Sequence, residues 1–180
     1  MHPRLAELVD YAEAQRAVLL DAVEAIPQGR RDERVDPDCW SVAEVLEHLH
    51  RVERGIARLA ADGVERARAQ GIGQERNEAS VLGSLDALQL LRRSPKITAP
   101  EAVAPRGAYS AAQALAALVE SREALLGTLT AADGLALGEI TQPHPLLGTL
   151  NLYQWVLFVG QHEARHTAQI REIASRLARR

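Results

Sequence analysis

Apolar residues recur at steps of three and four along four long stretches of the chain, the spacing of the buried face of an amphipathic helix. The pattern predicts helices over about residues 3–26, 41–68, 110–132 and 151–179. Alternating β-branched runs flanked by hairpin turns are absent, which favours an all-α domain. The sequence therefore predicts an all-α protein, folded as a four-helix bundle.

Three of the predicted helices begin at a residue whose side chain can accept a hydrogen bond from a free backbone N–H group. In each case a Glu or Gln three residues later can reach back to the backbone of the cap. The pairs are Ser41 with Glu44, Ser110 with Gln113 and, more weakly, Asn151 with Gln154. These capping boxes predict sharp helix starts at residues 41, 110 and 151.

Residues 71–106 separate the second helix from the third and hold several helix breakers. Gly71 and Gly73 interrupt the helical pattern, and prolines follow at positions 95, 100 and 105. A short helical pattern remains over residues 79–93. We expect a long crossover between helices two and three, and one domain over residues 1–180, because a chain of this length can bury a single substantial core.

Composition and charge limit the classes of partner that we expect the chain to bind. The net charge of -3 argues against a nucleic-acid partner, because binding phosphates needs a clustered basic surface. No run of 18 apolar residues occurs, and residues 1–10 are charged where a signal peptide would be apolar, so we expect no membrane partner. The single cysteine, Cys39, fits a reducing, cytoplasmic location. A homodimer is a hypothesis, with no particular face favoured.

Two histidines replace apolar residues on the buried face of the last helix. The positions on this face are Trp155, Val159, His162, His166, Ile170, Ile173 and Leu177. Residues four apart differ by only about 40° around a helix, so His162 and His166 can chelate one metal ion. Burying an imidazole without a partner costs about 1 to 3 kcal/mol, so each histidine needs an acceptor, a carboxylate or a metal. The pair favours a metal, and histidines hydrogen-bonded in a dry core are the alternative.

Two imidazoles leave a metal short of ligands, since catalytic zinc sites take three protein ligands. His48 is the best third candidate, because it lies inside the second helix at the edge of its apolar face. His50 lies about 200° further round that helix and is expected to be solvated. His2 is terminal, and His144 precedes a proline in a loop, where exposure is favoured over a place at a pocket mouth. The predicted ligands are His48, His162 and His166, with exchangeable positions left for water or substrate.

The string His162-Glu163-x-x-His166 also matches the HExxH signature of zinc metalloproteases, in which the glutamate is a general base. The downstream positions of the metzincin pattern hold Gln169 and Glu172, and no substrate-aligning sheet is evident. A protease is therefore the less favoured hypothesis. Glu163 lies about 100° from His162 on the helix and is interpreted as a general base or as an acceptor for a ligand, with a solvated surface glutamate as the alternative.

Two other side chains lie near the predicted site. Gln169, about 60° from His166 around the helix, can orient a ligand, and ordinary polarity explains it equally well. Trp40, beside the cap of the second helix, can wall a pocket, although a core anchor is the favoured interpretation.

Longer motifs connect these residues to a known family. The motifs are Trp40-Ser41-Val42-x-x-Val45-Leu46-x-His48-Leu49 and His144-Pro145-x-x-Gly148-x-Leu150, leading into His162-x-x-x-His166-x-x-Gln169-Ile170. Together they resemble the DinB/YfiT-like superfamily of stress-related, metal-dependent proteins, which is unrelated to the polymerase of similar name. The resemblance implies a four-helix bundle with a long crossover and a divalent metal held by His48, His162 and His166. Cys39 stands where the family often has glycine, a departure that affects the loop and not the ligands.

Characterised members of the family that this sequence resembles use low-molecular-weight thiols, as S-transferases or thiol-dependent isomerases. The resemblance implies a thiol co-substrate, and three imidazoles suit zinc or nickel, and also iron, cobalt or copper. A divalent cation lowers the pKa of a bound thiol or water and so supplies a nucleophile. We predict a metal-dependent S-transferase or hydrolase for a small molecule. The alternative is a bundle that binds metal or ligand without catalysis.

Overall fold

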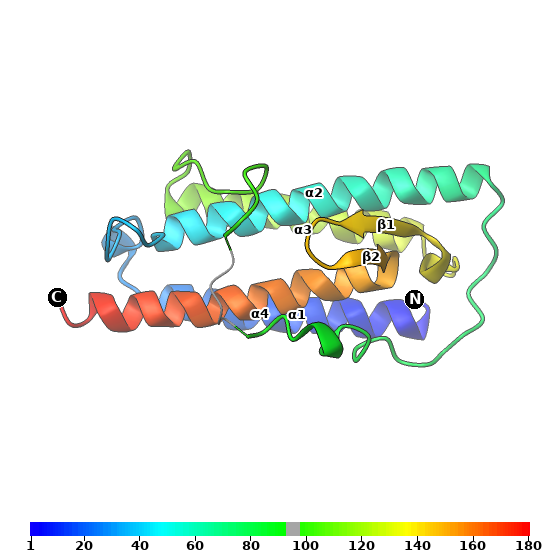
Figure 1. The fold of residues 1–180 in the computed structure, drawn as a ribbon, viewed down its shortest axis with the longest axis horizontal. Coiled ribbons are helices and arrows are strands. Elements are labelled where there is room, and N and C mark those ends of the chain that lie inside the picture. Colours follow the sequence, from blue (N-terminus) through cyan, green and yellow to red (C-terminus); the bar gives the residue numbers. More distant parts are fainter. Residues whose placement is uncertain (93–97) are drawn as a thin grey trace.

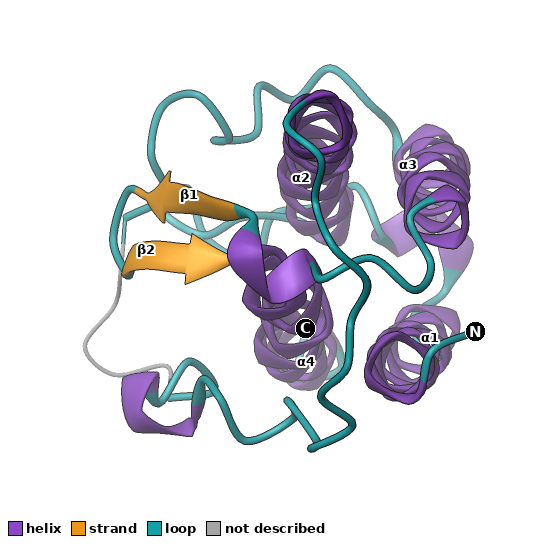
Figure 2. Cartoon of the chain, turned by 90° about the vertical axis from the view of Figure 1, so that its right-hand side faces the viewer, coloured by secondary structure: helices purple, strands orange, loops and turns teal. Residues whose placement is uncertain are grey.

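The computed structural model describes residues 1–92 and 98–180, and in it four helices pack as a bundle (Figure 1). The helices are α1 (Pro3–Glu24), α2 (Val42–Ala69), α3 (Ala111–Ala131) and α4 (Leu152–Leu177). Viewed end-on in Figure 2, α2 lies beside α3 and α1 beside α4, and these two pairs pack most closely. The predicted four-helix bundle is confirmed. None of the described helices combines the length and apolar character that crossing a membrane requires.

All three predicted capping boxes form. The side chains of Ser41, Ser110 and Asn151 each accept a hydrogen bond from the backbone N–H three residues later, and the side chain at that position accepts one from the cap backbone in return. These caps satisfy N–H groups that a helix start would otherwise leave without partners. The three helix starts therefore lie within a residue of their predicted positions.

A small antiparallel hairpin, which the sequence pattern did not predict, precedes α4 and adds to the helical bundle. Strands β1 (Thr141–His144) and β2 (Gly148–Asn151) pair from Thr141 with Asn151 to His144 with Gly148. Four-residue strands are too short to show a clear alternation, and a proline inside β1 lowers its apparent strand propensity. Gly148, at φ 81°, supplies the left-handed conformation that lets the chain reverse. The hairpin lies beside α2 and α4 (Figure 2).

The long crossover between α2 and α3 is confirmed, but the helix predicted over residues 79–93 is wrong. The described part of that range holds one short 3-10 turn, Asp86–Leu88, and Arg93 lies outside the described residues. Val81 and Leu85 are buried in the core, and the backbone N–H of Val81 donates to the Glu7 carboxylate at 2.6 Å. Packing against the bundle, rather than local helical pairing, therefore fixes this part of the crossover.

The apolar core divides into two clusters along the bundle. One cluster includes Leu8, Ile56 and Leu125, and the other includes Leu19, Leu49 and Leu118. The buried charged side chains Arg16, Glu53, Arg122 and Glu163 lie, along their helices, between the residues of these clusters. The bundle therefore carries a polar layer near its middle.

The close approach of α1 to α4 at Gly160 predicts a first substitution effect. A Cβ atom at Gly160 of α4 would lie 2.7 Å from two ring carbons of Tyr11 on α1. Gly160→Ala should therefore lower the free energy of unfolding by about 1–3 kcal/mol, as overpacked cores do. Urea unfolding measures this. Gly127→Ala is the matched control, because a Cβ at that helical position meets nothing within 4 Å, and equal stability of the two variants would contradict the close approach.

Candidate metal centre

Three imidazoles converge between α2 and α4. The Nε2 atom of His162 lies 3.2 Å from Nε2 of His48 and 3.1 Å from Nε2 of His166. One ligand atom from each residue lies within 4.8 Å of the others, and no further group of three or more His, Cys, Asp or Glu side chains meets this condition among the described residues. The structure thus brings together the three histidines that the sequence singled out.

The spacing of these nitrogens fits a divalent metal ion. Metal–nitrogen distances of about 2.0–2.1 Å place two ligand nitrogens about 2.9–3.4 Å apart in tetrahedral or octahedral coordination. The observed separations of 3.2 and 3.1 Å lie inside this range. Three imidazole donors also match the preference of zinc, nickel and their first-row neighbours.

The outer nitrogens of two rings have oxygen partners. Nδ1 of His48 donates to the carbonyl oxygen of Val103, and Nδ1 of His166 donates to Oε1 of Gln169, both at 2.8 Å. Each neutral ring then presents an unprotonated Nε2 to His162. One proton on Nε2 of His162 can make one of the two contacts a hydrogen bond, whereas the other sets two lone pairs against each other. A cation between the rings removes this repulsion, which a dry hydrogen-bonded core does not.

Burial keeps the rings in the form that binds metal. His48 is 4% exposed and His166 is 8% exposed. Burial lowers the pKa of His48, and it lowers the pKa of His162 well below its ordinary value, with the neighbouring histidines adding to the shift. Because a metal ligand must be a neutral imidazole, no proton has to be removed from these two side chains near pH 7.

Aromatic side chains hold the rings in place. Trp40 lies with its ring centroid 5.1 Å from that of His48 and 6.4 Å from that of His166, and Phe158 stacks on His162 at 5.1 Å and 20°. Trp40 also packs against the core cluster around Leu49. Trp40 therefore packs both in the core, as an anchor, and against the histidines, as a wall of the site.

The family follows from a comparison with known proteins. The model of the DinB superfamily matches residues 11–170, a range that contains all three histidines and both sequence motifs. The chain belongs to the DinB superfamily. It is also 28% identical over 141 residues to the uncharacterized protein YuaE of Bacillus subtilis (strain 168), covering 78% of this chain and 80% of that protein. No solved structure gives a significant match.

In this DinB protein Gln169 accepts a hydrogen bond from a ligand histidine, His166, as expected for a residue that orients a ligand. This contact leads to a second prediction. Gln169→Ala removes the acceptor of the His166 Nδ1 proton and should weaken metal binding about 10- to 100-fold, as the loss of such outer hydrogen bonds does. Competition against a chromophoric chelator measures the affinity. Gln28→Ala, at an exposed position of the loop after α1, is the matched control. Identical affinities of the two variants would show that Gln169 does not orient the ligand.

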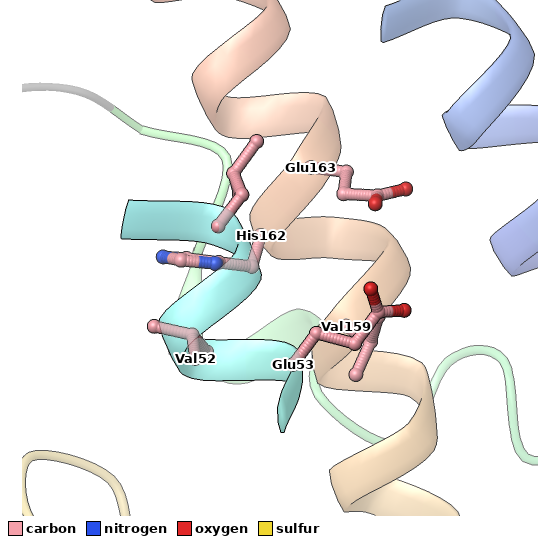
Figure 3. A pocket seen from close by; sticks show the side chains of 6 residues that line it. Val52, Glu53, Val159, His162 and Glu163 are labelled. Atoms are coloured by element: carbon pink, nitrogen blue, oxygen red, sulfur yellow. The ribbon is translucent and has the colours of Figure 1, made fainter. Parts of the chain in front are cut away.

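Glu163 lies in a different place from the one expected. It is 2% exposed, so the solvated surface glutamate is wrong, and its Oε1 accepts hydrogen bonds from Arg16 at 2.7 Å and Arg122 at 3.2 Å. Burial raises the pKa of this carboxyl, and the two guanidinium groups oppose the shift. Figure 3 shows the carboxylate pointing away from the imidazole of His162. This orientation argues against Glu163 as a general base, and so also against an HExxH protease.

Glu163 belongs to an ion-pair layer that the sequence did not predict. The layer consists of Arg16, Glu53, Arg122 and Glu163, one residue from each helix, all buried. Glu53 accepts from Arg16 at 2.8 Å and from Arg122 at 2.6 Å. A cavity of about 10 Å³, lined by His162, Glu53 and Glu163, lies beside the layer (Figure 3). The layer therefore links all four helices next to the histidines.

The remaining histidines stay outside the cluster. His50 is only 5% exposed, so its predicted solvation is wrong: α3 covers it, and its Nδ1 donates to the carbonyl oxygen of Ala117 at 2.8 Å. His144 is half-buried on β1, and its ring contacts Trp155 and Phe158. His2 caps the start of α1, where its backbone N–H donates to Asp133.

Proposed function

We propose that this DinB protein is a divalent-metal-dependent enzyme, a thiol-dependent S-transferase or a hydrolase acting on a small molecule. The observation that carries the proposal is the convergence of three Nε2 atoms on one point, from His48, His162 and His166. Structural metal sites are closed by four protein ligands, whereas catalytic sites use three and leave a position for exchange. No fourth side chain of a ligating type joins the cluster among the described residues.

The chain's own residues would prepare this site for chemistry. A zinc, nickel or similar ion held by the three histidines would lower the pKa of a bound thiol or water and supply a nucleophile at neutral pH. Val103 and Gln169 fix the protonated nitrogen of two rings, and the aromatic rings of Trp40 and Phe158 restrict their tilt. This positioning keeps the Nε2 atoms directed inward without a metal-induced rearrangement.

The test is turnover by the metal-loaded protein. We would combine an aryl halide electrophile with cysteine, glutathione and other small thiols, and run a parallel panel of esters and amides. Turnover with at least one combination is expected, falling at least about a hundredfold in His48→Ala with the helical circular dichroism unchanged. Gly127→Ala serves as the control variant. Turnover that persists in His48→Ala would contradict a metal mechanism.

The burial of the site favours one second candidate, a bundle that binds metal or ligand without turnover. His48 and His166 are buried, and the carbonyl oxygen of Val103 accepts a hydrogen bond from Nδ1 of His48. The cavity beside His162 has a volume of only about 10 Å³. Such enclosure suits retention of an ion better than passage of a substrate. This candidate predicts stoichiometric metal binding with no turnover in either panel.

A further inference from the structure

A groove between α2 and α3 is separate from the histidine cluster. Its volume is about 440 Å³, within the range of about 300–1,000 Å³ that is typical of small-molecule sites. His50 lines it from α2, two residues after His48, and residues two apart on a helix point about 200° apart. The groove therefore opens on the other side of α2 from the metal centre.

The floor of the groove holds a buried side chain with an unused nitrogen. His50 is 5% exposed and its Nδ1 donates to the carbonyl oxygen of Ala117. Its Nε2 makes no hydrogen bond to any described residue, and the ring packs edge-on against Tyr109 at 6.0 Å. Because Nδ1 carries the proton of the neutral ring, Nε2 can accept a hydrogen bond from a ligand in the groove.

Two opposite charges border the same groove. Arg54 of α2 and Glu120 of α3 both line it and both lie close enough to act electrostatically on His50. Within the described part of the chain, neither forms an ion pair with the other or with a third residue. Small side chains, including Ala116 and Ala124, leave the space between them open. Among the described residues, the groove thus offers a cation and an anion without ion-pair partners and, on the His50 ring, an acceptor nitrogen without a hydrogen bond.

We propose that this groove binds a small zwitterion of the amino-acid or dipeptide class. The guanidinium of Arg54 binds the ligand carboxylate, for which its planar fork of donors is suited. The ligand ammonium donates to Nε2 of His50 and to the carboxylate of Glu120. This site is independent of the metal centre and of the proposed enzymatic function, because it uses neither the three ligand histidines nor an ion.

The test follows the His50 ring by nuclear magnetic resonance of the full-length protein. The probes are the free amino acids and a set of dipeptides, each beside its N-acetyl and its C-terminal amide form. At least one zwitterion should shift the His50 resonances saturably, and each blocked form should bind about tenfold more weakly or worse, since charge-assisted hydrogen bonds are lost. Arg54→Gln and Glu120→Gln should weaken binding by a similar factor.

The matched controls are Arg58→Gln and Glu123→Gln, which are exposed on the same two helices and do not line the groove. Their affinities should stay within about twofold of the parent, as expected for distant surface charges. The proposal is overturned if no probe shifts His50 at millimolar concentrations, or if blocked and free forms bind equally. It is also overturned if His50 responds to protein concentration instead, because a second copy then covers the groove.

Discussion

Replacing His162 with alanine is expected to abolish stoichiometric metal binding. His162 is the central ligand of the cluster, with its Nε2 within 3.2 Å of His48 and 3.1 Å of His166. Its loss leaves one ligand on each of two helices, and affinity should fall at least about a hundredfold, more than the loss of an outer hydrogen bond causes. Plasma mass spectrometry of untagged protein, purified without chelators, measures the metal content.

The control for this variant is His2→Ala, which removes a histidine that lies outside the cluster. It should keep the parent's metal content of about one equivalent, the stoichiometry of a single three-ligand site. Helical circular dichroism of both variants shows whether the bundle is intact. A folded His162→Ala protein that retains a full equivalent of metal would show that the ion binds elsewhere.

The Arg122→Ala variant is expected to lose about 3–5 kcal/mol of unfolding free energy, as proteins do when one partner of a buried ion pair is removed. Arg122 donates to Glu53 at 2.6 Å and to Glu163 at 3.2 Å, and these carboxylates are 3% and 2% exposed. Without Arg122, only Arg16 remains to balance the two negative charges inside the bundle. Urea unfolding of the metal-free protein measures the effect without a contribution from the ion.

Arg58→Ala is the matched control for charge and helix propensity, because Arg58 is exposed on α2. Its unfolding free energy should stay within about 0.5 kcal/mol of the parent. A loss of less than about 1 kcal/mol in Arg122→Ala would mean that Glu53 and Glu163 are protonated or hydrated, so the ion-pair layer would not stabilise the bundle.

The parts of the structure that the sequence predicted are those fixed by local rules. Helical periodicity and the three capping boxes determine where the helices lie, since both depend on residues within four positions of each other. The spacing of His162 and His166 is local in the same way. His48 was predicted as the third ligand from its place on the apolar face of its own helix, and the resemblance to the DinB/YfiT-like proteins pointed to the same residue.

The errors arose where long-range packing decides. His50 was expected at the surface because histidine is usually solvated, but α3 covers it. Glu163 was expected beside the metal or at the surface, but two arginines from other helices pair with it. One local signal was present: Arg16 lies four residues after Ala12 and three before Leu19, both buried on the same face of α1. A charge on the apolar face of a helix needs a buried counter-charge.

Anomalous diffraction can locate the divalent metal that the Nε2 atoms of His48, His162 and His166 are expected to hold. The data would come from crystals of the metal-loaded protein, collected on both sides of the zinc and nickel absorption edges. One anomalous peak is expected about 2.0–2.2 Å from each of the three Nε2 atoms. A peak bound by other side chains, or no peak at the cluster in crystals grown with excess metal, would contradict this expectation.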